Sequence, residues 1–240
     1  MIVLLRTEAR KLRGSLALAL AVAAPALPGL LSLLAMASGR NAPAWSSIFG
    51  FAIPIWAMFL LPMTVAASTA LIAQIEHRAH GWDHLLALPI SRWQLFAAKL
   101  VVVAGVVAAM TVAMAGFTIL LSMLGGLIRG EMPLGAIPWV RTARSVGYLL
   151  SASAMLVVVQ LWSALRFANF VVPLGVGIGG TMVALAVAIV RTDKADYFPW
   201  VLPLNTLSGD DPALYATIGG IGGCALAVVM IVALARHSFR

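Results

Sequence analysis

Charged side chains are scarce in this sequence, and their scarcity excludes most soluble folds. The chain of 240 residues carries 16 basic and 8 acidic side chains, which together make up 10% of it. An average soluble domain has about 25%. Apolar residues make up 62%, so a soluble fold could not cover its surface with polar groups. Disordered chains are poor in apolar residues, so disorder is excluded too, and an integral membrane protein is the class that fits.

Several chemical features are also missing. The single cysteine, Cys224, cannot form an intrachain disulfide. No Gly-x-x-x-x-Gly-Lys-Ser/Thr phosphate loop occurs, so energy for uphill transport has to come from another chain. No acidic residue falls inside a predicted span, which argues against a carboxylate-based proton pump. Because no catalytic set of side chains is found either, we expect no enzyme activity, no cofactor and no metal centre in this chain.

Six stretches without Asp, Glu, Lys or Arg supply the predicted membrane spans. They cover residues 14–39, 41–75, 100–128, 145–165, 167–190 and 212–235. Each can hold the roughly 20 helical residues that cross a bilayer, and no period-two alternation favours a lipid-facing β-barrel. The sequence predicts an all-α integral membrane protein, with a single transmembrane domain over residues 1–240 and six helices at about 15–37, 51–75, 100–124, 145–165, 167–190 and 213–235.

Basic residues gather on one side of the predicted spans. With the amino terminus inside, the inner segments hold ten basic and three acidic residues, and the outer segments hold six and five. The positive-inside rule then places both termini in the cytoplasm of a bacterium, with the chain in its cytoplasmic (inner) membrane. Arg141 and Arg144 depart from this trend on the outer side. The basic excess predicts anionic lipid head groups as partners, and no nucleic acid.

Residues 1–13 predict a short amphipathic helix before the first span. Apolar and basic residues alternate at helical spacing, at Leu5, Ala9 and Leu12 and at Arg6, Arg10 and Arg13. Such a helix lies in the membrane interface with its arginines at lipid phosphates. A basic flank that only sets orientation is the alternative. The apolar run that follows is too long for a signal peptide, so we expect it to form the first span.

The connection 76–99 predicts a cytoplasmic elbow that lies flat against the membrane. An apolar face and an opposite histidine face follow at 100° per residue, formed by Ala79, Trp82, Leu85 and Leu86 and by His77, His80 and His84. Pro89 then breaks the helix. Three imidazoles could share a zinc ion, but a single helix rarely closes a tetrahedral site. We therefore favour a solvated docking face over a metalloenzyme.

The outer connection 191–212 contains an apolar segment that is too short to span. It reads Tyr197-Phe-Pro199-Trp200-Val-Leu-Pro203-Leu. We expect a re-entrant or interfacial helix there, anchored at the outer surface by the two aromatic residues Tyr197 and Trp200.

Glycines within the spans predict close helix packing. The run from Gly175 to Gly180 matches the letters of a dinucleotide fingerprint, but no strand precedes it and the span around it is apolar. Small-xxx-small faces explain these glycines better. The predicted packing positions are Gly175, Gly179, Gly219 and Gly223.

On these features the sequence resembles the membrane subunit of ABC-2 type exporters, in particular the permeases of lantibiotic and bacteriocin self-protection transporters. The resemblance rests on the six-span plan, the amphipathic amino terminus and two motifs. The elbow motif consists of Glu76, Arg78, Gly81, Trp82, Leu85, Leu88-Pro89-Ile-Ser-Arg92 and Lys99, and the outer motif consists of Pro199, Trp200 and Pro203.

The resemblance implies that the elbow is a coupling helix that docks on a separate cytoplasmic ATPase, which binds ATP and Mg²⁺. Two copies of the ATPase and a second six-span permease, identical or a sister chain, would complete the transporter. The implied coupling residues are Glu76, Arg78, Trp82, Asp83, His84, Pro89 and Arg92, and the implied outer gate residues are Tyr197, Pro199, Trp200 and Pro203.

The implied function is that of a non-catalytic permease, which exports an amphipathic peptide or another hydrophobic substrate and serves antimicrobial-peptide immunity. A membrane scaffold or sensor that recruits an ATPase or another partner, without transporting anything, is the alternative.

Overall fold

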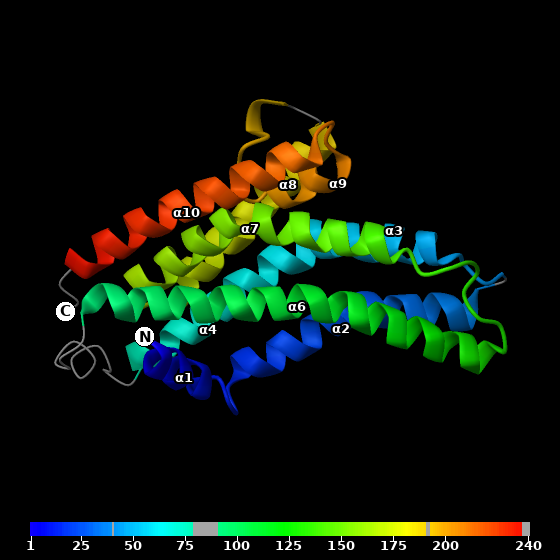
Figure 1. Cartoon of the computed structure of the whole chain (residues 1–240), viewed down its shortest axis with the longest axis horizontal. Helices are drawn as coiled ribbons and strands as arrows, with labels where there is room; N and C mark the ends of the chain where they lie inside the picture. The colour runs from blue at the N-terminus through cyan, green and yellow to red at the C-terminus, as the bar shows by residue number, and fades with distance from the viewer. Residues whose placement is uncertain (40, 79–90, 191–192, 237–240) are drawn as a thin grey trace.

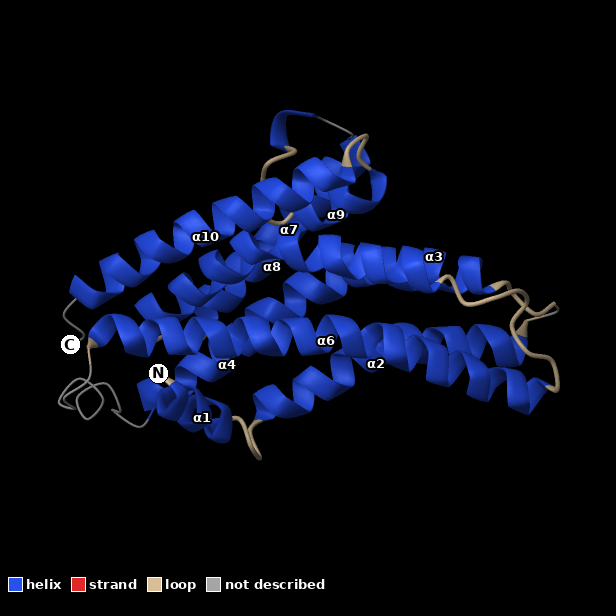
Figure 2. Cartoon of the chain, viewed as in Figure 1, coloured by secondary structure: helices blue, strands red, loops and turns tan. Residues whose placement is uncertain are grey.

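The computed structural model describes residues 1–39, 41–78, 91–190 and 193–236 (Figure 1). Helices dominate this part of the chain, and no β-strand is found in it (Figure 2). An isolated bridge between Ala44 and Leu134 joins two connections at the far end of the bundle. The all-α class that the composition predicts is therefore confirmed.

The helices follow one another with short connections. Their bounds are α1 Ile2–Lys11, α2 Leu16–Ser38, α3 Trp45–Ile55, the π-helical turn η1 Trp56–Leu60, α4 Leu61–Arg78, α6 Arg92–Arg129, α7 Trp139–Arg166, α8 Val171–Val190, the 3₁₀ turn η2 Asp193–Ala195, α9 Leu202–Ser208 and α10 Pro212–Arg236. Together, α3, η1 and α4 form one continuous span.

Six helices in the described part of the chain are long and apolar enough to cross a membrane, which confirms the predicted number. The connection between the second and third spans is shorter than the predicted elbow, because α4 continues to Arg78 and α6 begins at Arg92. Charged residues near both helix ends find partners inside the protein, so the helices do not have to stop before them. At 1.5 Å per residue the 38 residues of α6 extend over about 57 Å.

Helix α1, the start of α6 and the end of α10 lie at one end of the bundle, and α9 lies toward the other end (Figure 1). An even number of spans requires this arrangement of the two chain termini. Helices α2 and α6 run side by side, and α7 packs along α10. The backbones approach closely at Gly29, whose Cα faces the backbone of Phe117 on α6.

The glycines of the last two spans differ in what they contact. Gly219 and Gly223 lie against Ala152 and Ala154 of α7, with no room for a side chain. Gly175 and Gly179 have no other helix within 4 Å, so the packing predicted for them is not found within the chain. Helix α8 is rotated so that a different set of residues faces inward, namely Pro173, Gly177, Gly180, Thr181 and Ala184.

Candidate functional site

Four charged side chains form a closed network at the end of the bundle where α1 lies. Lys11 Nζ lies 2.5 Å from Glu8 Oε1 and 2.9 Å from Glu76 Oε1. Lys99 Nζ lies 2.7 Å from Glu8 Oε2 and 2.9 Å from Glu76 Oε1. Each lysine therefore bridges both glutamates, and the network joins α1, α4 and α6. We call Glu8, Lys11, Glu76 and Lys99 the charge network.

The charge network is buried and electrically balanced. Lys99 is 0% exposed, Glu76 2% and Glu8 4%, while the Lys11 side chain keeps 23% of its surface exposed. Two positive and two negative charges cancel, so no net charge is buried. Removing one member of such a network leaves an uncompensated charge in the interior and costs about 3–5 kcal/mol.

Sequence spacing on α1 explains how one short helix supplies half of the network. Glu8 and Lys11 are three residues apart, so they lie on the same face of the helix. Leu12 is buried beside them, whereas Ala9 is exposed. The inner face of α1 is thus centred on Glu8, which corrects the predicted face of Leu5, Ala9 and Leu12. The attraction between Glu8 and the buried Lys99 accounts for the difference.

The two α1 members have shifted pKa values that keep both charged. Burial opposes the charge of Glu8, but the attraction of Lys99 and hydrogen bonds from both lysines outweigh it and lower the pKa of Glu8. Burial also opposes the charge of Lys11, but hydrogen bonds to Glu8 and Glu76 outweigh it and raise the pKa of Lys11. Both shifts favour the ionised network at neutral pH.

Further hydrogen bonds connect both flanks of the 79–90 connection to the rest of the bundle. Gln74 Nε2 donates to Ala168 O at 2.8 Å, and His77 Nε2 lies 3.2 Å from Ala164 O. Both contacts bring the end of α4 to the corner between α7 and α8. At the start of α6, Arg92 Nη1 donates to the carbonyl oxygen of the α10 residue Ala235 at 3.5 Å.

The structure describes only part of the predicted coupling set. Glu76 is buried in the charge network instead of facing a partner, and Arg92 is exposed at the start of α6. Arg78 is the last residue of α4. The other predicted coupling residues lie outside the described residues, as do two of the three histidines; these are Trp82, Asp83, His84 and Pro89, and His80. Within the described ranges, no cluster of metal-ligating side chains occurs.

The predicted outer segment folds back into the protein. Trp200 is 4% exposed, stacks on Phe198 with ring centroids 5.1 Å apart, and lies against Gly180 of α8. Tyr197 remains 61% exposed. Of the two predicted surface anchors, Trp200 is therefore an internal residue, because Gly180 leaves room for its ring.

The remaining predicted gate residues flank this internal tryptophan. Pro199 is half-buried immediately before it. Pro203 is buried in the first turn of α9. The segment therefore enters the bundle with Trp200 and Pro203, whereas Tyr197 stays at its surface.

Sequence reasoning did not identify the charge network or the role of Gln160. Gln160 of α7 is fully buried. With its amide turned to satisfy its neighbours, its nitrogen donates to Pro173 O at 3.2 Å and its oxygen accepts from Gly177 N at 2.9 Å. One side chain thus bonds to two consecutive turns of α8. The signal for the network was present in the sequence, since Glu8, Glu76 and Lys99 are charged residues next to apolar runs.

A comparison with known families identifies one match. The sequence profile described as ABC-2 family transporter protein matches residues 4–184, which include all four members of the charge network. No curated protein and no solved structure matches the chain.

Proposed function

Because the chain belongs to the ABC-2 family of transporter proteins, we propose that it is the non-catalytic permease subunit of an ATP-driven exporter. It is a multi-pass membrane protein with six spanning helices. In this proposal a separate cytoplasmic ATPase, in two copies, binds ATP and Mg²⁺. A second six-span permease, identical or a sister chain, completes the pathway in a bacterial cytoplasmic membrane, and both termini face the cytoplasm.

The observation that carries the proposal is the charge network at the base of the 79–90 connection. Glu76 lies at the end of α4, before this connection, and Lys99 lies in α6, after it. A force on the connection therefore reaches both spans through a direct ion pair. Separating that pair in a dry interior would cost several kcal/mol. We infer that α1, α4 and α6 move as one rigid lever at this end.

The second span contains a place where such a lever can bend. The π-helical turn η1 interrupts the α-helix at Trp56–Leu60, and a proline lies on each side of it, at Pro54 and Pro62. Both features weaken the regular backbone hydrogen bonds of a helix. Motion of the inner half of α4 could therefore change the outer half through this turn, while the Trp56 indole stays bonded to Thr111 of α6 at 3.4 Å.

An apolar pocket supports a hydrophobic or amphipathic substrate, such as a membrane-active peptide. It has a volume of about 410 Å³ between α6, α7 and α10 and is lined by Leu100, Val101, Ala104, Val107, Ala108, Leu150, Ser153, Ala154, Val157, Val158, Gly223, Cys224 and Ala227. Such walls select by shape and apolar contact. The buried outer segment around Trp200 would form the gate at the other end, and immunity to an antimicrobial peptide is the corresponding biological role.

The proposal is tested by co-reconstituting the chain with its ATPase in vesicles that contain a fluorescent amphipathic peptide. We expect no ATP turnover by the chain alone and ATP-dependent peptide export by the complex. The double variant Glu76→Gln/Lys99→Met breaks the link without burying a net charge. It should keep ATPase binding and ATP hydrolysis but lose export.

Three outcomes would count against this function. ATP hydrolysis by the isolated chain would refute a non-catalytic subunit. Full export by the double variant would remove the charge network from the mechanism. ATPase recruitment without export by the wild-type complex would favour the alternative of a scaffold or sensor subunit.

A further inference from the structure

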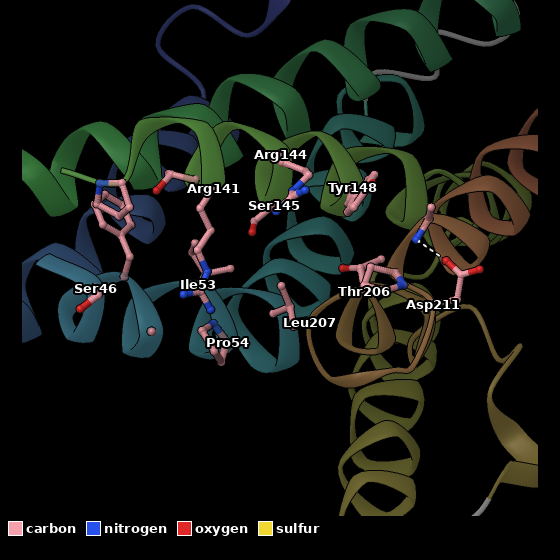
Figure 3. A pocket seen from close by; sticks show the side chains of 16 residues that line it. Ser46, Ile53, Pro54, Arg141, Arg144, Ser145, Tyr148, Thr206, Leu207 and Asp211 are labelled. Atoms are coloured by element: carbon pink, nitrogen blue, oxygen red, sulfur yellow. Dashed lines mark hydrogen bonds between the residues drawn. The ribbon is translucent and has the colours of Figure 1, made fainter. Parts of the chain in front are cut away.

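A second pocket lies at the other end of the bundle, between α3, the first turns of α7 and the α9–α10 connection (Figure 3). Its volume is about 580 Å³. Its lining combines polar and apolar residues, namely Ser46, Phe49, Gly50, Ile53, Pro54, Pro138, Arg141, Thr142, Arg144, Ser145, Tyr148, Thr206, Leu207, Asp211, Pro212 and Ala213. We call it the outer pocket.

The outer pocket carries a positive charge that its own residues do not neutralise. Arg141 and Arg144 project from α7, and Arg141 reaches toward Pro54 on the facing helix (Figure 3). Asp211 is the acidic residue of the lining, but its Oδ1 accepts hydrogen bonds at 3.1 Å from two backbone amides at the start of α10. Both arginines lie in the first two turns of α7, where the helix dipole adds further positive potential.

The opposite wall of the outer pocket is apolar, and a buried polar group lies between the two surfaces. Phe49 is 3% exposed and Ile53 is 6% exposed, and both line the pocket. Thr142 is 6% exposed, and its hydroxyl oxygen has no hydrogen-bond partner among the described residues. A ligand with an anionic oxygen group and an apolar tail would match both surfaces.

The position of the pocket along the spans points to a membrane lipid. Pro212 is the first residue of α10, a 25-residue span, so the pocket lies at the level where this span meets the head groups. Basic residues on this side depart from the positive-inside trend, and a ligand for Arg141 and Arg144 explains that departure. We propose that the outer pocket binds the phosphate head group of an anionic lipid, with the lipid tail along Phe49 and Ile53.

The test is site-specific photo-crosslinking in vesicles of phosphatidylglycerol and phosphatidylcholine. A photoreactive residue replaces Ser46, an exposed residue of the pocket lining, and the crosslinked lipid is identified by mass spectrometry. We expect phosphatidylglycerol to be enriched over its bulk fraction by about fivefold per arginine. The variant Arg141→Gln/Arg144→Gln should lose the enrichment, whereas Lys194→Gln, an exposed cation outside the pocket, should keep it.

The outcomes separate the possible sources of the phosphate group. Crosslinks in the bulk lipid ratio for the wild type would overturn the proposal, as would unchanged enrichment in the double-arginine variant. Displacement of the lipid by millimolar inorganic phosphate would assign the site to the free anion and overturn the lipid. Both arginines are exposed, so their replacement should leave the size-exclusion profile unchanged. No ATPase is needed, so this test is independent of the proposed export function.

Discussion

Replacing Lys99 by methionine should destabilise the protein more than any other conservative change at a charged residue. Methionine keeps most of the apolar stem but removes the ammonium group that lies 2.7 Å from Glu8 and 2.9 Å from Glu76. Only Lys11 would then face two buried carboxylates. Breaking a buried charge pair on one side costs about 3–5 kcal/mol. We therefore expect the free energy of unfolding to fall by about that amount.

The magnitude can be divided with a double-mutant cycle. Glu76→Gln in the Lys99→Met background removes the charge that lost its partner and leaves the Glu8–Lys11 pair in place at 2.5 Å. The double variant should therefore recover much of the loss, giving a coupling energy in the upper part of the 0.5–3 kcal/mol that is usual for contacting residues, about 2–3 kcal/mol. Additive effects of the two substitutions would show that the ion pair has no energetic coupling.

The measurement is unfolding of the purified chain in mixed micelles with increasing sodium dodecyl sulfate, followed by circular dichroism. Lys194→Met is the matched control, because Lys194 is exposed, and its effect should stay within about 0.5 kcal/mol. A loss for Lys99→Met no larger than that of the control would refute the argument that the charge network holds α1, α4 and α6 together.

Three further predictions follow from the same packing. The pKa of Glu8 is lowered, so its contribution to stability should be full above the ordinary carboxyl pKa of about 4.3 and be lost as pH falls through the folded value. The pKa of Lys11 is raised, so its contribution should be full below about pH 10.4 and be lost as pH rises through the folded value. Thermal unfolding against pH should therefore show a stability plateau between these limits, and a steady slope across neutral pH would contradict the assignment. Gly177→Val should destabilise by about 1–3 kcal/mol, because a side chain there meets Ala66 and Gln160, whereas Gly175→Val should be tolerated, because its position is open. Trp200→Ala should cost about 3–5 kcal/mol by leaving a cavity against α8; a cost below 1 kcal/mol would show that the segment lies on the surface.

Local sequence information was sufficient for the six spans, because each depends only on a run of apolar residues of the right length. It was not sufficient for their ends. Lys99 and Arg92 were assigned to a connection, yet both lie in α6. A charged residue can continue a helix when a partner far away in the sequence neutralises it, and Glu8 is 91 residues from Lys99. No local rule contains that information.

The rotation of each helix was also beyond the sequence. Gly175 and Gly179 have the same spacing as Gly219 and Gly223, but only the second pair faces another helix within the chain. A nearly uniform apolar helix has almost no moment to orient it. What orients α8 is a small number of specific contacts, such as the bond between Gln160 and Gly177 and the fit of Trp200 against Gly180.

Charge is used in opposite ways at the two ends of the bundle, and this difference separates a structural role from a binding role. Around Lys99 the positive and negative charges are equal and buried, so every charge is satisfied within the chain and the helices are joined. Around Arg141 and Arg144 the positive charges are exposed, and the neighbouring Asp211 is bonded to backbone amides. A balanced network leaves nothing for a ligand, whereas an unbalanced pair beside an apolar wall attracts one. Removing a charge should therefore weaken folding at the first end and lipid binding at the second.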